Sequence, residues 1–91
     1  MKAIEKVKKV LEPDGLTLAE LERGVPAEIV KIGAKGEIKH RLLEMGVVRG
    51  SRVVVERVAP LGDPIEVRIM GYRLSLRHTE AVTITVRKPD S

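Results

Sequence analysis

The last third of the chain alternates apolar and charged residues with a period of two, and this pattern constrains the fold more than any other feature. In Ile65–Ile69 the apolar side chains fall on one side of an extended strand and the charged ones on the other. Residues 72–76 and 82–86 repeat the alternation. A strand with one apolar face must bury that face against another element, so the pattern predicts a mainly β protein.

The rest of the sequence supplies two further strands and one helix. Val-rich or Ile-rich runs predict strands over residues 27–32 and 52–58. Residues 37–45 carry apolar side chains at helical spacing, and Gly46 follows where a left-handed cap residue is wanted. Five short strands in 91 residues bury one-sided faces best by curling and closing, which predicts an SH3-like five-stranded β-barrel with one short inserted helix closing one side. The expected interior comprises Val53, Val55, Ile65, Val67, Ile69, Leu74, Ile84 and Val86.

Residues 1–15 are predicted to form an N-terminal helical extension, with residues 16–91 as the barrel domain. Ile4, Val7 and Leu11 lie at helical spacing, and Pro13 to Gly15 end the pattern. A helix this short is marginal in isolation, so it must dock on another surface. Its own domain, a partner and a second copy of the chain all remain open as that surface.

Composition excludes several classes of function and site. The chain has no Cys, so disulfides, thiolate metal sites and cysteine nucleophiles are absent. No apolar run approaches the roughly 20 residues that span a bilayer, which predicts a cytoplasmic protein without direct membrane insertion. Charged residues make up 33% of the chain while Asn, Gln and Cys are missing, a composition typical of a thermophile.

The sequence offers no catalytic group and only weak metal ligands. Its serines have no base beside them in sequence, so we expect no enzyme activity and no cofactor. His40 and Glu44 stand four residues apart on one helix, and His78 lies far along the chain. These three residues are the candidate metal ligands, but zinc sites usually need three or four ligands from one chain. We therefore predict that the fold requires no metal.

The segment 59–64 interrupts the strand pattern with an unusual corner. Gly62 and Asp63 suit a tight reversal, because Gly tolerates positive φ and Asp can hydrogen-bond its own backbone. Pro64 donates no ladder hydrogen bond and so limits strand pairing there. Leu61 is then either tucked under its own hairpin or presented to a partner.

A nucleic-acid function is the alternative interpretation. Small SH3-like barrels occur in ribosomal and transcription proteins, which suggests an RNA-binding or translation-associated barrel. Four arginines on the predicted strands could form a basic face: Arg68, Arg73, Arg77 and Arg87. Against this, Glu66 and Glu80 interrupt that face, and Tyr72 is the one aromatic residue available for base stacking. We therefore expect no nucleic-acid partner.

Two stretches of the sequence resemble a known family. "RLLEMGVVRGSRV" at residues 41–53 and "APLGDPIEVRIMGYRLSLRHTEAVTITV" at residues 59–86 are similar to the ferrous iron transport protein A (FeoA) family. The resemblance implies a non-enzymatic accessory or regulatory protein of ferrous iron uptake that binds a FeoB-type membrane transporter, through either its cytosolic G-protein part or its membrane part. It also implies a location in the cytoplasm and, through the partner, at the inner face of the membrane.

The same resemblance suggests where the partner binds. The expected partner-binding residues are Leu42 and Met45 beside the helix end, together with the corner residues Leu61, Gly62, Asp63 and Pro64. Their proximity is an implication of the family's fold. A homo-oligomer is also compatible with the resemblance.

Overall fold

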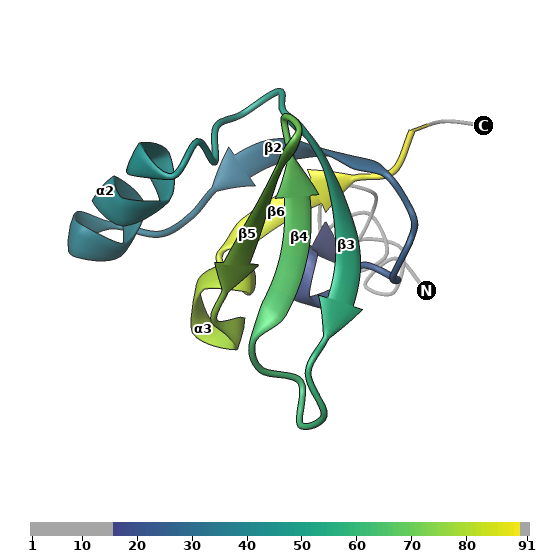
Figure 1. The fold of residues 1–91 in the computed structure, drawn as a ribbon. Coiled ribbons are helices and arrows are strands. Elements are labelled where there is room, and N and C mark those ends of the chain that lie inside the picture. The colour runs from purple at the N-terminus through teal and green to yellow at the C-terminus, as the bar shows by residue number, and fades with distance from the viewer. Residues whose placement is uncertain (1–15, 90–91) are drawn as a thin grey trace, which may run out of the picture.

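Six antiparallel strands form one curled sheet in this computed structural model, which describes residues 16–89 (Figure 1). The strand order is β1-β6-β2-β3-β4-β5. The elements are β1 (Leu16–Thr17), the 3-10 helix η2 (Leu18–Glu20), β2 (Ala27–Ile32), α2 (Gly36–Glu44), β3 (Arg52–Val58), β4 (Ile65–Ile69), β5 (Tyr72–Leu76), α3 (His78–Ala81) and β6 (Ile84–Arg87). The predicted extension over residues 1–15 lies outside the described residues.

The mainly β, SH3-like character of the fold is confirmed, but two details of the predicted barrel are wrong. The sheet has six strands, because the two-residue strand β1 pairs with β6. It is not closed into a barrel, since β1 and β5 end the strand order. The curl still brings β6 and β1 behind β3 and β4 in the view of Figure 1, so the inner faces of the sheet meet.

The core lies between these inner faces and is entirely aliphatic. The expected period-two pattern holds along β4, where Ile65, Val67 and Ile69 are buried and the charged residues between them are half-buried. Leu74 is half-buried and packs against the core. The other fully buried large side chains come from most of the remaining elements: Leu18, Ile29, Leu42, Val47, Val53, Val55, Leu76, Ile84 and Val86.

Helix α2 ends where the sequence predicts, but it does not close one side of the sheet. Gly46 has φ +95°, and the N–H groups of Gly46 and Val47 donate to the carbonyls of Leu43 and Leu42 at 3.0 Å, as in a left-handed cap. Leu42 is the buried residue of α2, whereas Ile38 is 41% exposed. Figure 1 shows α2 projecting beyond the edge of the sheet, anchored near its C-terminal end.

A second short helix, α3, precedes the last strand and delays its start. The sequence pattern extends this strand from residue 82, but β6 begins at Ile84 and Val82 is 43% exposed. The cause is a capping contact at the start of α3: Glu80 Oε1 accepts the N–H of Arg77 at 2.8 Å. This contact holds residues 78–81 in a helical turn. The N–H groups of Val82 and Thr83 then donate to the carbonyls of His78 and Glu80, so these two residues close the helix instead of beginning the strand.

Candidate protein-interaction site

The corner between β3 and β4 is a tight, hydrogen-bonded loop. The N–H of Ala59 donates to the carbonyl of Pro64 at 3.0 Å, and the N–H of Gly62 donates to the carbonyl of Ala59 at 2.8 Å. Gly62 has φ +85°, which confirms the expected left-handed position. The Asp63–Pro64 peptide bond is cis. Two backbone hydrogen bonds therefore hold the loop, and one of them joins its two ends.

Asp63 ties this loop to a distant part of the chain. Its Oδ1 accepts the N–H of His78 at 2.9 Å, so the carboxylate binds the start of α3. The sequence interpretation has Asp63 bonding its own backbone, whereas the contact in the structure joins residues 15 positions apart. The corner is thus braced against a second element, which limits its freedom to move relative to the sheet.

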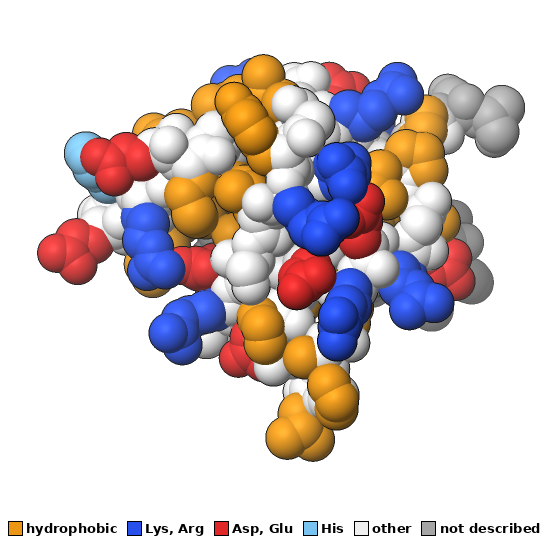
Figure 2. Space-filling view, in the orientation of Figure 1, with side chains coloured by type: hydrophobic (Ala, Val, Ile, Leu, Met, Phe, Trp, Pro, Cys, Tyr) orange, Lys and Arg blue, Asp and Glu red, His pale blue; other side chains and the backbone are white. Residues whose placement is uncertain are grey.

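Leu61 lies at the tip of this braced loop with its side chain 100% exposed. The alternative in which Leu61 is tucked under its hairpin is therefore wrong for this structure. Val58 is 43% exposed, and Pro60 and Pro64 are also exposed. We call Val58, Pro60, Leu61 and Pro64 the apolar tip; it forms the orange protrusion at the bottom of Figure 2.

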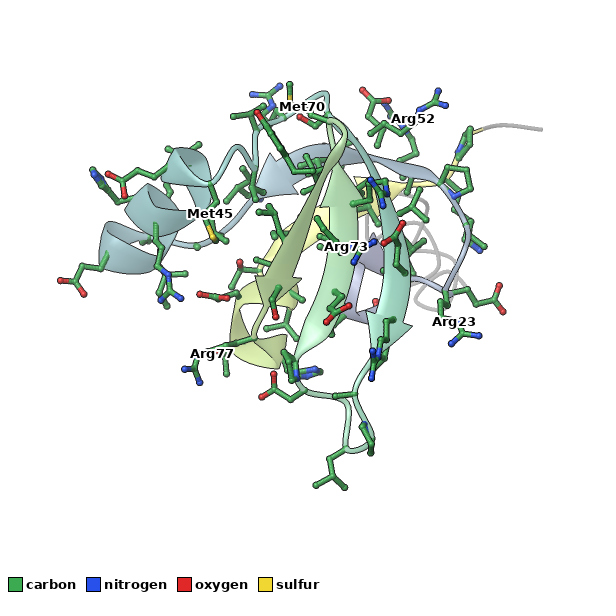
Figure 3. All side chains as sticks on the ribbon, viewed as in Figure 1. Arg23, Met45, Arg52, Met70, Arg73 and Arg77 are labelled. Atoms are coloured by element: carbon green, nitrogen blue, oxygen red, sulfur yellow. The ribbon has the colours of Figure 1, made fainter. Side chains whose placement is uncertain are left out.

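Leu42 and Met45 do not join the apolar tip. Leu42 has no exposed surface, because it anchors α2 in the core, and Met45 is half-buried against that core. Figure 3 shows Met45 beside α2 at the left, whereas the loop after β3 is at the bottom of the molecule. The implied apolar surface from the helix end to the corner is therefore absent, and Leu42 is a core residue.

The candidate metal ligands do not assemble. His40 Nε2 lies 3.2 Å from Glu44 Oε2, as the spacing predicts, and both side chains are exposed. His78 is instead on α3, where its backbone N–H binds Asp63. No group of three His, Asp or Glu side chains within residues 16–89 is arranged to hold a metal ion.

Two of the four strand arginines are engaged by an acidic side chain on β3. Arg68 Nε donates to Glu56 Oε2 at 2.7 Å, and Arg73 Nε lies 3.4 Å from Glu56 Oε1. Glu56 therefore joins strands β3, β4 and β5 on the outer face of the sheet. This pairing reduces the basic face on which the nucleic-acid interpretation depends.

The Glu56 contacts predict a pH dependence. The hydrogen bond from Arg68 lowers the pKa of Glu56 below its ordinary value, and the charges of Arg68 and Arg73 act in the same direction against desolvation. Because the pKa is lower in the folded state, the contact stabilises the fold at pH values above the unfolded pKa. That stabilisation is lost as the pH falls through the folded pKa.

We expect an NMR titration to show Glu56 ionising below its usual range, and Arg68→Gln to move this pKa upward. Arg77→Gln is the control, because Arg77 makes no contact with Glu56 among the described residues. An unchanged Glu56 titration in Arg68→Gln would show that the hydrogen bond does not control ionisation.

Glu80 is the one buried carboxylate in the described part of the chain, whereas its sequence context predicts a surface charge. Its side chain is 3% exposed. Besides accepting the N–H of Arg77, it places Oε2 at 3.5 Å from Arg41 Nη1 on α2. A Glu three positions after the N-cap residue is one half of a capping-box pattern. The other half is Ser, Thr, Asp or Asn at the N-cap, and Arg77 occupies that position here, so the sequence carries only a weak signal for this helix.

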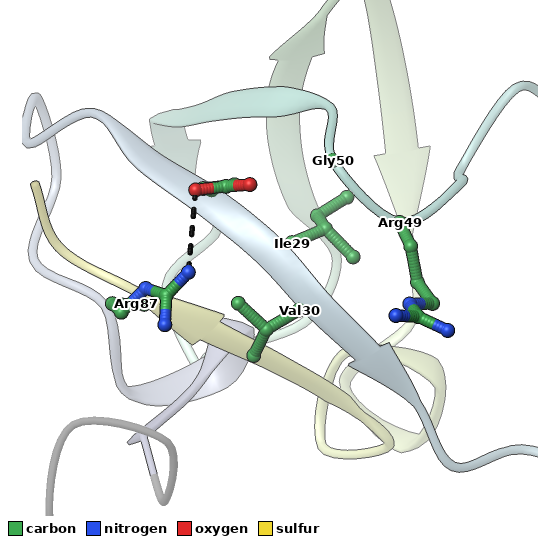
Figure 4. Close-up of a pocket in the computed structure, with 6 residues that line it drawn as sticks. Ile29, Val30, Arg49, Gly50 and Arg87 are labelled. Atoms are coloured by element: carbon green, nitrogen blue, oxygen red, sulfur yellow. Dashed lines mark ion pairs between the residues drawn. The ribbon is translucent and has the colours of Figure 1, made fainter.

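A shallow hollow of about 500 Å³ lies over β2 (Figure 4). Its floor includes Ile29 and Val30, and Arg49 and Arg87 stand at its two sides. Glu28 is the acidic residue in its lining, and its Oε1 lies 3.6 Å from Arg87 Nη2. The lining of this hollow holds one carboxylate and no His, Cys or second acidic side chain to pair with it as an acid–base group.

The curled sheet, the inserted helix α2 and the protruding apolar corner define a small SH3-like domain. Residues 16–88 match the family described as FeoA domain, and the chain belongs to this family. The family resemblance in the sequence is thereby confirmed. None of the helices within residues 16–89 is long and apolar enough to cross a membrane.

Three relatives illustrate the similarity. Over 71 residues the chain is 44% identical to the Fe(2+) transport protein A/Fe(2+) transporter FeoB fusion protein of Porphyromonas gingivalis, a match covering 78% of this chain and 8% of that protein. The solution structure of FeoA from Chlorobium tepidum has a TM-score of 0.76 and 43% identity, covering 82% of this chain and 71% of the other. The Stenotrophomonas maltophilia FeoA complexed with zinc, described as a prokaryotic SH3 domain protein, has a TM-score of 0.65 and 32% identity, covering 78% and 88%.

Proposed function

We propose that this chain is a non-enzymatic accessory protein of ferrous iron uptake that acts in the cytoplasm by binding a FeoB-type transporter. The observation that carries the proposal is the Porphyromonas gingivalis relative, in which the matching unit is part of one polypeptide with the transporter FeoB. Covalent fusion gives two domains a high effective concentration, which preserves a contact between them. In a separate chain the same contact requires a recognition surface.

The apolar tip supports such a surface. Leu61 exposes its entire side chain, which is unfavourable in water unless a partner covers it. The loop is braced by Asp63 and by its internal hydrogen bonds, so little conformational entropy is lost when it binds.

We expect Leu61→Ala to weaken binding to the cytosolic domain of the transporter by about 1–3 kcal/mol, the range of an interface hot spot. Its melting temperature should stay close to that of the wild type, because Leu61 contacts no core residue at 100% exposure. Isothermal titration calorimetry with the transporter domain in GDP and GTP-analogue states, combined with thermal melts, measures both quantities.

Leu43→Ala is the matched control, since Leu43 is 44% exposed on α2, far from the loop after β3. It should bind as the wild type does. Equal losses for Leu43→Ala and Leu61→Ala, or a lower melting temperature with full binding in Leu61→Ala, would contradict a recognition role for the tip.

A further inference from the structure

Within residues 16–89, strand β5 has one free edge. It pairs with β4 along its whole length, from Ile69↔Tyr72 to Ile65↔Leu76, and it ends the strand order. No other strand within residues 16–89 pairs with it. The backbone groups that point away from β4 are therefore available to a further strand.

The register shows which backbone groups these are. Two residues, Met70 and Gly71, connect β4 to β5, so the flanking pair Ile69 and Tyr72 is the first hydrogen-bonded pair. Along an antiparallel ladder, hydrogen-bonded pairs alternate with non-hydrogen-bonded pairs, whose N–H and C=O groups point away from the neighbouring strand. The N–H and C=O groups of Arg73 and Ser75 consequently point to the free edge, and both residues are exposed.

A hollow of about 490 Å³ lies at the end of this edge. Its lining combines the end of β5, the base of the apolar tip and one residue of α2: Arg41, Asp63, Pro64, Ser75, Leu76 and Arg77. The hollow therefore lies between the free edge of β5 and the loop that carries Leu61.

Exposed positive charge dominates this surface. Arg41 and Arg73 have side chains 58% and 65% exposed, and Arg77 is also exposed. The carboxylate of Glu80, which pairs with Arg41, is 3% exposed, and that of Glu56, which pairs with Arg73, is 31% exposed. Asp63 already uses Oδ1 to bind His78. A segment that lies along β5 therefore meets more accessible cations than anions.

We propose that β5 accepts an extended acidic segment of the partner as an additional strand. The outward groups of Arg73 and Ser75 supply the main-chain hydrogen bonds, and the guanidinium groups select acidic side chains. A second copy of this chain fits less well, because pairing β5 with β5 brings Arg73 and Arg77 against like charges. The assignment of the segment to a transporter rests on the proposed function, whereas its acidic, extended chemistry rests on the strand edge alone.

Ser75→Pro tests the hydrogen bonds directly. Proline removes the outward N–H but leaves the ladder to β4 intact, because the N–H of Ser75 does not point to β4. Ser75→Ala keeps the N–H and is the matched control. The probes are two end-blocked eight-residue peptides, one alternating Val and Glu and the other alternating Val and Lys, at concentrations up to the millimolar range.

We expect the Val–Glu peptide to bind the wild-type chain and to slow amide hydrogen exchange at Arg73 and Ser75. The Val–Lys peptide should do neither. Ser75→Pro should weaken binding by about tenfold, the loss of one hydrogen bond, with Ser75→Ala unchanged. Arg77→Glu should also weaken binding and flatten its dependence on salt.

The inference is overturned if millimolar Val–Glu peptide leaves exchange at Arg73 and Ser75 unchanged, or if Ser75→Pro binds as tightly as Ser75→Ala. A thermal melt tests whether Ser75→Pro is folded. If it is not folded, the affinity of Arg77→Glu for the Val–Glu peptide is decisive, and an affinity equal to that of the wild type overturns the inference. These peptide measurements do not depend on the transporter. Loss of transporter binding in Leu61→Ala but not in Ser75→Pro would reject strand addition and leave the proposed function standing.

Discussion

Val67→Asp is expected to unfold the domain. Val67 has no exposed surface and lies in the middle of β4, paired with Val55 on β3 and Leu74 on β5. An unpaired carboxylate at this position costs several kcal/mol, against a total stability of about 5–15 kcal/mol for a domain of this kind. Circular dichroism should show no cooperative melt, or one shifted down by tens of degrees.

Val58→Asp is the control for this substitution. Val58 lies at the end of β3 and is 43% exposed, so its new carboxylate stays in water. We expect this variant to melt within a few degrees of the wild type. A cooperative melt of Val67→Asp in the same range would show that the interior of β4 admits water.

The second large effect is expected at Glu80. Glu80→Ala leaves the N–H of Arg77 without its acceptor and removes the carboxylate that faces Arg41. Loss of a side-chain cap at the start of a helix costs about 0.5–2 kcal/mol, so we expect a loss of that order in chemical denaturation. The ion pair itself contributes little, because Arg41 is 58% exposed.

Two further variants separate the hydrogen bond from the charge. Glu80→Gln keeps an oxygen acceptor for Arg77 and should recover most of the stability. Glu44→Ala, at an exposed carboxylate on α2, should change the free energy of unfolding by less than about 0.5 kcal/mol. If Glu80→Gln is as unstable as Glu80→Ala, the charge stabilises α3 more than the cap does.

The strand pattern is the part of the structure that sequence reasoning predicted best. Along β4 each apolar residue is buried, because alternation in an extended chain assigns side chains to faces without reference to any distant residue. The cap at Gly46 is equally local, since it depends on a left-handed residue at the end of one helix. Membership of the family could also be predicted, because two contiguous stretches of sequence carry the resemblance.

Predictions that required distant contacts fared less well. The burial of Glu80 depends on α2 and α3 coming close enough for Arg41 to reach it, and no local pattern encodes that approach. Leu42 was expected at a binding surface, yet it anchors α2 in the core. The brace from Asp63 to His78 likewise joins elements 15 residues apart.

The sequence by itself determined strands β2 to β5, the apolar face of β4 and the position of the corner, because these properties follow from the spacing of neighbouring residues. Within residues 16–89, the tertiary structure decided that the sheet stays open, that β5 keeps a free edge and that Leu61 points into solvent. These outcomes depend on how far the whole sheet curls and on which elements cover its ends. That curl is the sum of packing between segments distant in the chain, so no local pattern contains it.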